Sequence, residues 1–262
     1  MTSSPRESGS STTPAALHLS KAPLVRVMCQ ARWSGLSKFD AKDVAAGLAD
    51  AIGDEYPFSE QQHEMEVTIT PTGVTQKPTG IIHRFQSVDR LWTVTLSDLF
   101  LALDTVDYYG HVDFIERLGQ AFDALLGVAR IPSLARVGYR YTNRLDQPED
   151  ILRVKEYFAP SILGGLAHDT PSRVAQTVSE TLLKDGGKYL AVRSALLGPN
   201  ASIDPTLAPV PTQSWLVDLD SYEESAKGLP VNSLRDRAAE LSDRASAHFR
   251  QLITDAFIVR FR

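Results

Sequence analysis

The chain has 262 residues, of which 43% are hydrophobic and 23% charged, and its formal net charge is -5. This length is enough for one large or two small globular domains, and the acidic total disfavours a general nucleic-acid coat protein. The single cysteine, Cys29, excludes an internal disulfide and a cysteine-based metal cluster, and no run reaches the ~18 apolar residues needed to span a bilayer. We therefore expect a cytoplasmic protein.

The chain begins with a Ser/Thr-rich segment that lacks an apolar core, so residues 1–20 are expected to be a disordered tail. The first folded half, residues 21–132, is predicted to contain a strand, a helix, four antiparallel strands and a long helix. These elements are expected at 24–32, 39–52, 63–70, 81–88, 91–96, 100–105 and 109–128. The apolar stripe of the long helix is Val112, Ile115, Leu118, Phe122, Leu125 and Leu126.

The second half, residues 133–262, has a similar order of elements. Strands are predicted at 133–146, 173–183, 189–197 and 215–220, a short helix at 151–158, and a long helix at 231–257, with the last residues extended. Gly186 and Gly187 are typical of a tight hairpin turn. Residues 198–213 hold four prolines and are expected to form a long surface loop.

A strand-helix-meander-helix unit used twice predicts an α+β fold with two pseudo-repeated halves that share one curved antiparallel sheet. The two long helices, each with one apolar stripe, are expected on one face of the sheet, which leaves the other face open. By analogy, this plan resembles the saddle of the TATA-box-binding protein.

The strand at residues 133–146 carries the main functional signal. With a period of two, Ala135, Val137, Tyr139, Tyr141 and Leu145 lie on one face, while arginines alternate on the other with Leu134, Gly138 and Thr142. Arginine suits bidentate contacts with carboxylate or phosphate. Arginines of other predicted strands can share this face, and Arg173 is a further candidate. The candidate binding residues are Arg26, Arg32, Arg84, Arg136, Arg140, Arg144 and Arg193. The alternative is a solvated face whose arginines are balanced by Asp and Glu neighbours.

Three stretches carry a family resemblance: Lys21-Ala-Pro-Leu24, Trp92-Thr-Val-Thr-Leu96 and Arg136-Val-Gly-Tyr-Arg-Tyr-Thr-Asn-Arg144. Together they resemble a sporadically distributed family of bacterial proteins of about this length, over residues 20–262. The family has no agreed catalytic residues, so the resemblance implies none here. It implies a bacterial cytoplasmic protein of an accessory gene set, such as a defence or toxin-antitoxin locus.

Catalytic and cofactor motifs are absent from the sequence. It contains no phosphate-binding glycine loop, no dinucleotide fingerprint and no serine nucleophile elbow, and no metal or cofactor site is predicted. Cys29 is expected to be a buried structural thiol. His63 and His83 can meet across the meander, although a structural role is favoured. Asp218 and Asp220 point the same way from one strand and can bind a cation or act in acid-base chemistry, but a solvent-facing strand explains them better.

These observations favour a non-catalytic protein that binds a protein or peptide through an exposed sheet face or edge, by charge or strand addition. A nucleic-acid binder that uses the same arginines is the second hypothesis, because Tyr139 and Tyr141 face away from the arginines and leave them without aromatic neighbours. An enzyme with a site built from distant residues, such as Asp218 and Asp220, is the third. The oligomeric state is left open.

Overall fold

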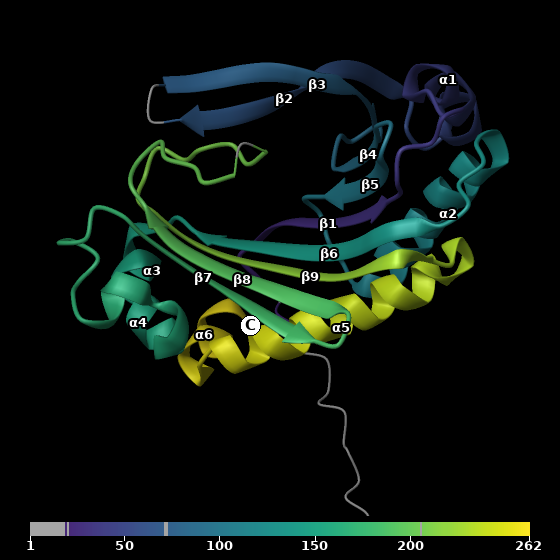
Figure 1. Ribbon diagram of the computed structural model, residues 1–262. Helices are drawn as coiled ribbons and strands as arrows, with labels where there is room; N and C mark the ends of the chain where they lie inside the picture. Colours follow the sequence, from purple (N-terminus) through teal and green to yellow (C-terminus); the bar gives the residue numbers. More distant parts are fainter. Residues whose placement is uncertain (1–18, 20, 71–72, 205) are drawn as a thin grey trace, which may run out of the picture.

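In a computed structural model, the chain forms an α+β fold around one nine-stranded antiparallel sheet (Figure 1). The structure describes residues 19, 21–70, 73–204 and 206–262, and the side chains of residues 63–79 lie outside the description, as does the tail expected at residues 1–20 apart from Leu19. The order of strands in the sheet is β2-β3-β4-β5-β1-β6-β9-β8-β7. The strands are β1 (Leu24–Arg32), β2 (Phe58–Thr70), β3 (Gly73–Gln86), β4 (Trp92–Leu96), β5 (Phe100–Thr105), β6 (Leu134–Leu145), β7 (Thr177–Asp185), β8 (Lys188–Leu197) and β9 (Ser214–Leu229).

The helices lie on one face of this sheet, which Figure 1 shows curving above α5. They are α1 (Ala41–Ile52), α2 (His111–Val128), α3 (Pro148–Leu152), α4 (Val154–Tyr157), α5 (Leu234–Leu252) and α6 (Asp255–Phe261). Asp40 caps α1 by accepting a hydrogen bond from the backbone N–H of Lys42. Within the described residues, no helix combines the length and apolar character that crossing a bilayer requires.

The pair of strands β1 and β6 lies at the centre of the sheet. These two strands are about 100 residues apart in the sequence, so their pairing is a long-range contact. Cys29 lies opposite Tyr139, and the alternating residues Val27, Cys29 and Ala31 of β1 are completely buried under the helices. One apolar cluster joins β1, β3, β4, β5 and β6 to α1, α2 and the first half of α5. A second joins β8 and β9 to α3, α4, α6 and the end of α5. The helix-covered face therefore forms the main core.

Several predicted elements are wrong in extent or kind. The long C-terminal helix breaks at Ile253, whose backbone is extended, and Thr254 caps α6, so the last residues are helical and not extended. Val112 is 73% exposed and is not part of the buried stripe of α2, where Phe114 is buried instead. Leu134 is buried in the core although period two places it with the arginines, because a register shift between β6 and β9 follows it.

The face of the sheet opposite the helices is partly covered by a loop. Residues 198–204 and 206–213, which we call the strap, run back over this face after β8 (Figure 1). Partly buried Ala201, Ile203 and Leu207 of the strap pack against Ala195, Leu197 and Leu216 of the sheet. The helix-free face is therefore only partly open, in contrast to the expectation of a fully open one.

Candidate functional site

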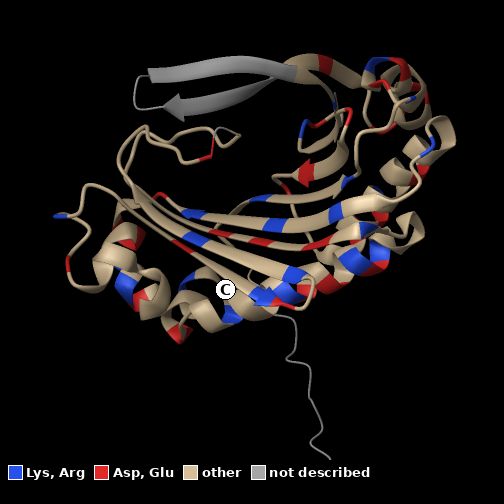
Figure 2. Cartoon of the chain, viewed as in Figure 1, with Lys and Arg blue, Asp and Glu red and all other residues tan. Residues whose placement is uncertain are grey.

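The helix-free face carries alternating positive and negative side chains, and we call it the arginine face. Figure 2 shows bands of both charges running across β6, β9 and β8. The period of two places Arg136, Arg140 and Arg144 of β6 on this face. Antiparallel pairing puts Arg140 directly opposite Asp220 of β9, and Asp218 opposite Thr142. Five of the seven candidate arginines form ion pairs with described carboxylates: Arg26, Arg84, Arg136, Arg140 and Arg193. The chain thus supplies its own counter-ions.

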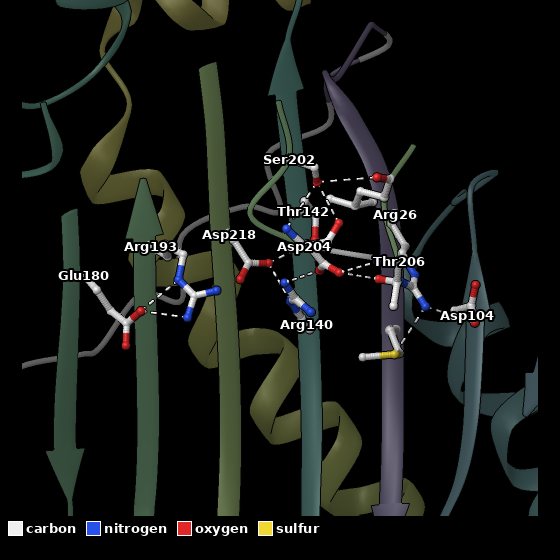
Figure 3. Close-up of polar contacts among 12 residues, drawn as sticks. Arg26, Asp104, Arg140, Thr142, Glu180, Arg193, Ser202, Asp204, Thr206 and Asp218 are labelled. Atoms are coloured by element: carbon white, nitrogen blue, oxygen red, sulfur yellow. Dashed lines mark hydrogen bonds and ion pairs between the residues drawn. The ribbon is translucent and has the colours of Figure 1, made fainter. Parts of the chain in front are cut away.

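At one end of the face, Arg140 is held between two buried carboxylates (Figure 3). Its Nε donates to Asp218 Oδ1 at 2.6 Å, and its Nη2 donates to Asp204 Oδ2 of the strap at 2.7 Å. The carboxylate side chains are 6% and 7% exposed, respectively. Thr142 also donates to Asp218 at 2.9 Å. This group ties the strap to the middle of the sheet, and it leaves little of Arg140 for an external ligand.

Two further arginines hold the strap to the same end of the sheet. Arg26 of β1 donates to the hydroxyl of Thr206 and lies 3.3 Å from Asp104 of β5. Arg144 of β6 donates to the backbone carbonyl of Ala208 at 2.8 Å. A cavity of about 10 Å³ beside Arg144, below the strap, has room for a single water. We refer to Arg26, Arg140, Arg144 and the strap as the strapped end.

The protonation equilibria agree with a built-in ionic group. Although burial opposes the effect, hydrogen bonds from Thr206 and the charge of Arg140 lower the pKa of Asp204 below its usual range. Burial also opposes the charged form of Arg140, but the hydrogen bond to Asp218 raises its pKa. By contrast, burial raises the pKa of Asp220 in spite of the nearby Arg136. The strap contact is therefore made between fully charged groups at neutral pH.

The other end of the face carries a stack of cations and aromatic rings. Tyr222 of β9 and Tyr189 of β8 are directly opposite each other, and their rings stack with centroids 5.0 Å apart and planes 15° apart. The guanidinium of Arg136 lies 4.2 Å from the centroid of Tyr222 on β9, and the ammonium of Lys184 lies 5.6 Å from that of Tyr189. We call these four residues the cation-tyrosine stack. Both tyrosines are partly exposed.

Gly138 of β6 leaves room for the side chain of Arg136 in this stack. It lies directly opposite Tyr222. A Cβ atom at Gly138 would meet Nη1 of Arg136 at 3.3 Å. Arg136 also donates to Asp220 at 2.8 Å and lies 3.5 Å from Glu224, which is 53% exposed. The guanidinium is thus held by two carboxylates and a ring while its surroundings stay open to solvent.

The remaining candidates lie at the margins of the face. Arg193 of β8 pairs with Glu180 of β7 at 2.7 Å, and Arg84 of β3 pairs with Glu60 of β2 at 3.4 Å. Arg32 lies over the ring of Phe100 at 5.9 Å and contacts none of the described carboxylates. Arg173 precedes β7 and is 77% exposed, so it does not belong to the sheet face.

The aromatic neighbours of the arginines are the feature that sequence reasoning missed. Tyr139 and Tyr141 point into the helix-covered face, as their parity indicates, but Tyr222 reaches Arg136 from the neighbouring strand β9, and Tyr189 stacks on Tyr222. The expectation of an arginine face without aromatics is therefore wrong. The alternation of Tyr222 with Asp218 and Asp220 signals its face, but only if β9 is extended beyond the predicted end at Asp220.

The other chemical candidates are occupied by structural contacts. Asp218 and Asp220 each form an ion pair with an arginine, so the two carboxylates are not free to bind a cation together. Gln61, and not His63, is opposite His83, which is buried, and the side chain of His63 lies outside the description. Burial raises the pKa of Cys29, which keeps the thiol protonated. Among the described residues, no group of three or more His, Cys, Asp or Glu side chains is arranged to hold a metal ion.

Comparison of the chain with models of known protein families and with curated proteins finds no match.

Proposed function

We propose that this chain is a non-catalytic binding protein that captures a polypeptide through the open end of the arginine face. The observation that carries the proposal is the cation-tyrosine stack, in which Arg136, Tyr222 and Tyr189 are ordered in advance yet remain partly exposed. Tyrosine and arginine are the residues enriched at the centres of protein interfaces, where they supply large contact areas at low entropic cost. Ordering before binding lowers that cost further.

The charge balance of the face supports a polypeptide over a nucleic acid. Arg136, Arg193 and Arg140 each have carboxylates within ion-pair distance, so a polyanion would meet acidic groups beside every one of them. Phosphate binding depends on uncompensated cations. A polypeptide with polar groups and charges of both signs can instead match the alternating pattern.

The arrangement of the rings supports the same choice. One face of Tyr222 is covered by Arg136 and the other by Tyr189, whose far face lies below Lys184. A nucleobase needs a free ring face for stacking, whereas a polypeptide can use the ring edges and hydroxyls. Burial and the charge of Glu224 raise the pKa of Tyr222, so its hydroxyl stays a hydrogen-bond donor.

We also infer the finer plan of the fold from the strand order. Outwards from the centre, β1 is followed by β5, β4 and β3, and β6 is followed by β9 and β8, so each half starts with its own first strand and continues with its last. This order supports two pseudo-repeated halves in which α2 and α5 are the equivalent long helices. The family resemblance of β6 supports a bacterial accessory locus as the setting.

The test is a pull-down from the native host with the full chain, with and without nuclease. The Tyr222→Ala, Tyr189→Ala double variant should lose the retained protein, because it removes the rings while the core stays intact. Tyr109→Ala is the matched control, since Tyr109 is 80% exposed and lies away from the stack. Equal recovery by the double variant and the control would contradict the proposal, and loss of the retained material on nuclease treatment alone would favour nucleic acid.

A further inference from the structure

We propose that the chain associates with a second copy of itself through the outer edge of β7, in an antiparallel pairing centred on Leu182. This inference does not rest on the proposed function, because it is argued from the edge of the sheet and shares only Lys184 with the cation-tyrosine stack. It concerns the last strand in the order of the sheet, where none of the described strands pairs with the outer edge.

The second half of β7 is unusually accessible for a sheet strand. Every residue from Glu180 to Asp185 is exposed, and these include the apolar Leu182 and Leu183 at 56% and 37%. The strand has no proline, and it pairs with β8 from Thr177 to Asp185 without a register shift. The edge strands of monomeric proteins are normally interrupted by prolines or bulges, because a regular edge is a template for another strand. The 3₁₀ turn at Gly164–Ala167 lies against the first part of β7, where the N–H of Gly165 donates to Thr177 and Gly164 lies close to Ser179.

The hairpin turn determines which backbone groups face outwards. Asp185 and Lys188 flank the two-residue turn, in which Gly186 has a φ of 58°. In a hairpin of this kind the flanking residues form a hydrogen-bonded pair, and hydrogen-bonded and non-hydrogen-bonded pairs then alternate. Glu180, Leu182 and Lys184 therefore direct their N–H and C=O groups away from β8. A second strand centred on Leu182 would satisfy about six of these groups and their counterparts.

The side chains select one register for the pairing. With Leu182 opposite Leu182 of the second copy, Glu180 lies opposite Lys184 of the second copy, and the reverse pair completes the two-fold symmetry. All these side chains lie on the arginine face, because Glu180 and Lys184 are opposite Arg193 and Tyr189. A shift that centres the pairing on Thr181 places Glu180 opposite Leu182 and leaves both charges unmatched. The edge is therefore complementary to itself in charge and in apolar contact.

The pairing joins two sheets into one and has a consequence for the arginine face. Lys184, which ends the cation-tyrosine stack of one copy, would contact Glu180 of the second copy, and Arg193 already pairs with Glu180 in each copy. The two arginine faces thereby become one continuous surface with alternating charge.

Cross-linking provides the first test. Cys29 is completely buried, so Leu182→Cys introduces the one accessible thiol of the described residues. Opposed residues in a hydrogen-bonded antiparallel pair have Cα atoms about 5.5 Å apart, which a disulfide spans. We expect Leu182→Cys to form a covalent dimer under mild oxidation at micromolar concentration. Leu99→Cys, at a residue 41% exposed in a different turn, is the control and should remain monomeric.

Sedimentation equilibrium of the unmodified chain and of charge variants provides the second test of the proposed dimer. Lys184→Glu places like charges together twice and should raise the dimer dissociation constant by about tenfold. The double variant Glu180→Lys, Lys184→Glu restores opposite charges and should recover most of this loss. A chain that is monomeric up to about 100 μM, or a dimer that Lys184→Glu and Leu182→Asp leave unchanged, would overturn the proposal. Thermal melting of each variant separates loss of pairing from loss of folding.

Discussion

The two ends of the arginine face use the same type of residue in opposite ways. At the strapped end, Arg140 joins Asp204 and Asp218, whose side chains are 7% and 6% exposed. At the open end, Arg136 joins Asp220 and Glu224, which are 28% and 53% exposed. The arginines themselves differ little, at 20% and 22% exposed. The two ends therefore differ in the burial of the carboxylate partners and not in that of the arginines.

The largest effect should come from removal of the cation at the strapped end. Arg140→Ala leaves two buried carboxylates without a counter-ion, which costs about 3 kcal/mol or more of unfolding free energy. Arg193→Ala on the next strand but one is the matched control, and it should cost less than about 1 kcal/mol because Glu180 is 52% exposed and can be hydrated. Urea unfolding of both variants measures the difference. Equal losses would remove the distinction between buried and exposed partners.

A smaller effect, which depends on pH, should come from the strap itself. The pKa of Asp204 is lowered in the folded protein, so its stabilisation is present above the unfolded value of about 3.9 and is lost as the pH falls through the folded value. Asp204→Asn should therefore cost about 1–2 kcal/mol between pH 5 and 8, and the difference from the unmodified chain should shrink below about pH 4. Urea unfolding at each pH measures this difference. Asp54→Asn, at an exposed residue, is the control variant.

The smallest effect on stability is expected at the open end. Gly138→Ala should change the unfolding free energy by less than about 1 kcal/mol, because the new Cβ would meet the end of the long Arg136 side chain and no backbone atom. It should nevertheless displace the guanidinium from Tyr222, which NMR would detect as loss of the ring-current shift of the Arg136 Nε–H proton. A large loss of stability together with an unchanged shift would show that the stack is a rigid part of the core.

The sequence predicts the structure best where the hydrophobic pattern of a single strand or helix is enough to define that element. The bounds of β1 and β5 and the parity of Arg136 and Arg140 follow from local alternation, and α1 begins within two residues of the predicted start at residue 39. Residues 221–229 lack such alternation, yet they form the end of β9, which pairs with β6 as far as Leu229 and with β8 as far as Glu223. Tertiary pairing here overrides a weak local preference for strand.

Only the arginines of the candidate site could be predicted by the same reasoning. The arginines could be listed, but their partners depend on the register between distant strands, as for Arg140 and Asp218, or on a loop, as for Asp204. Tyr189 and Tyr222 meet because β8 and β9 pair in the register that puts them opposite each other. Contacts of this kind are long-range properties of the sheet and have no local pattern.

The central pairing of β1 with β6 also has a consequence during synthesis. β1 can pair with β5 as soon as the first half has emerged from the ribosome, but its other edge waits until β6 has been made. Until then, Val27, Cys29 and Ala31 belong to an unprotected strand edge in the growing chain. Domains fold as they emerge, and unpaired edges of this kind are where nascent chains aggregate or recruit chaperones. A ribosome-bound chain that ends before β6 is therefore the species most in need of such protection.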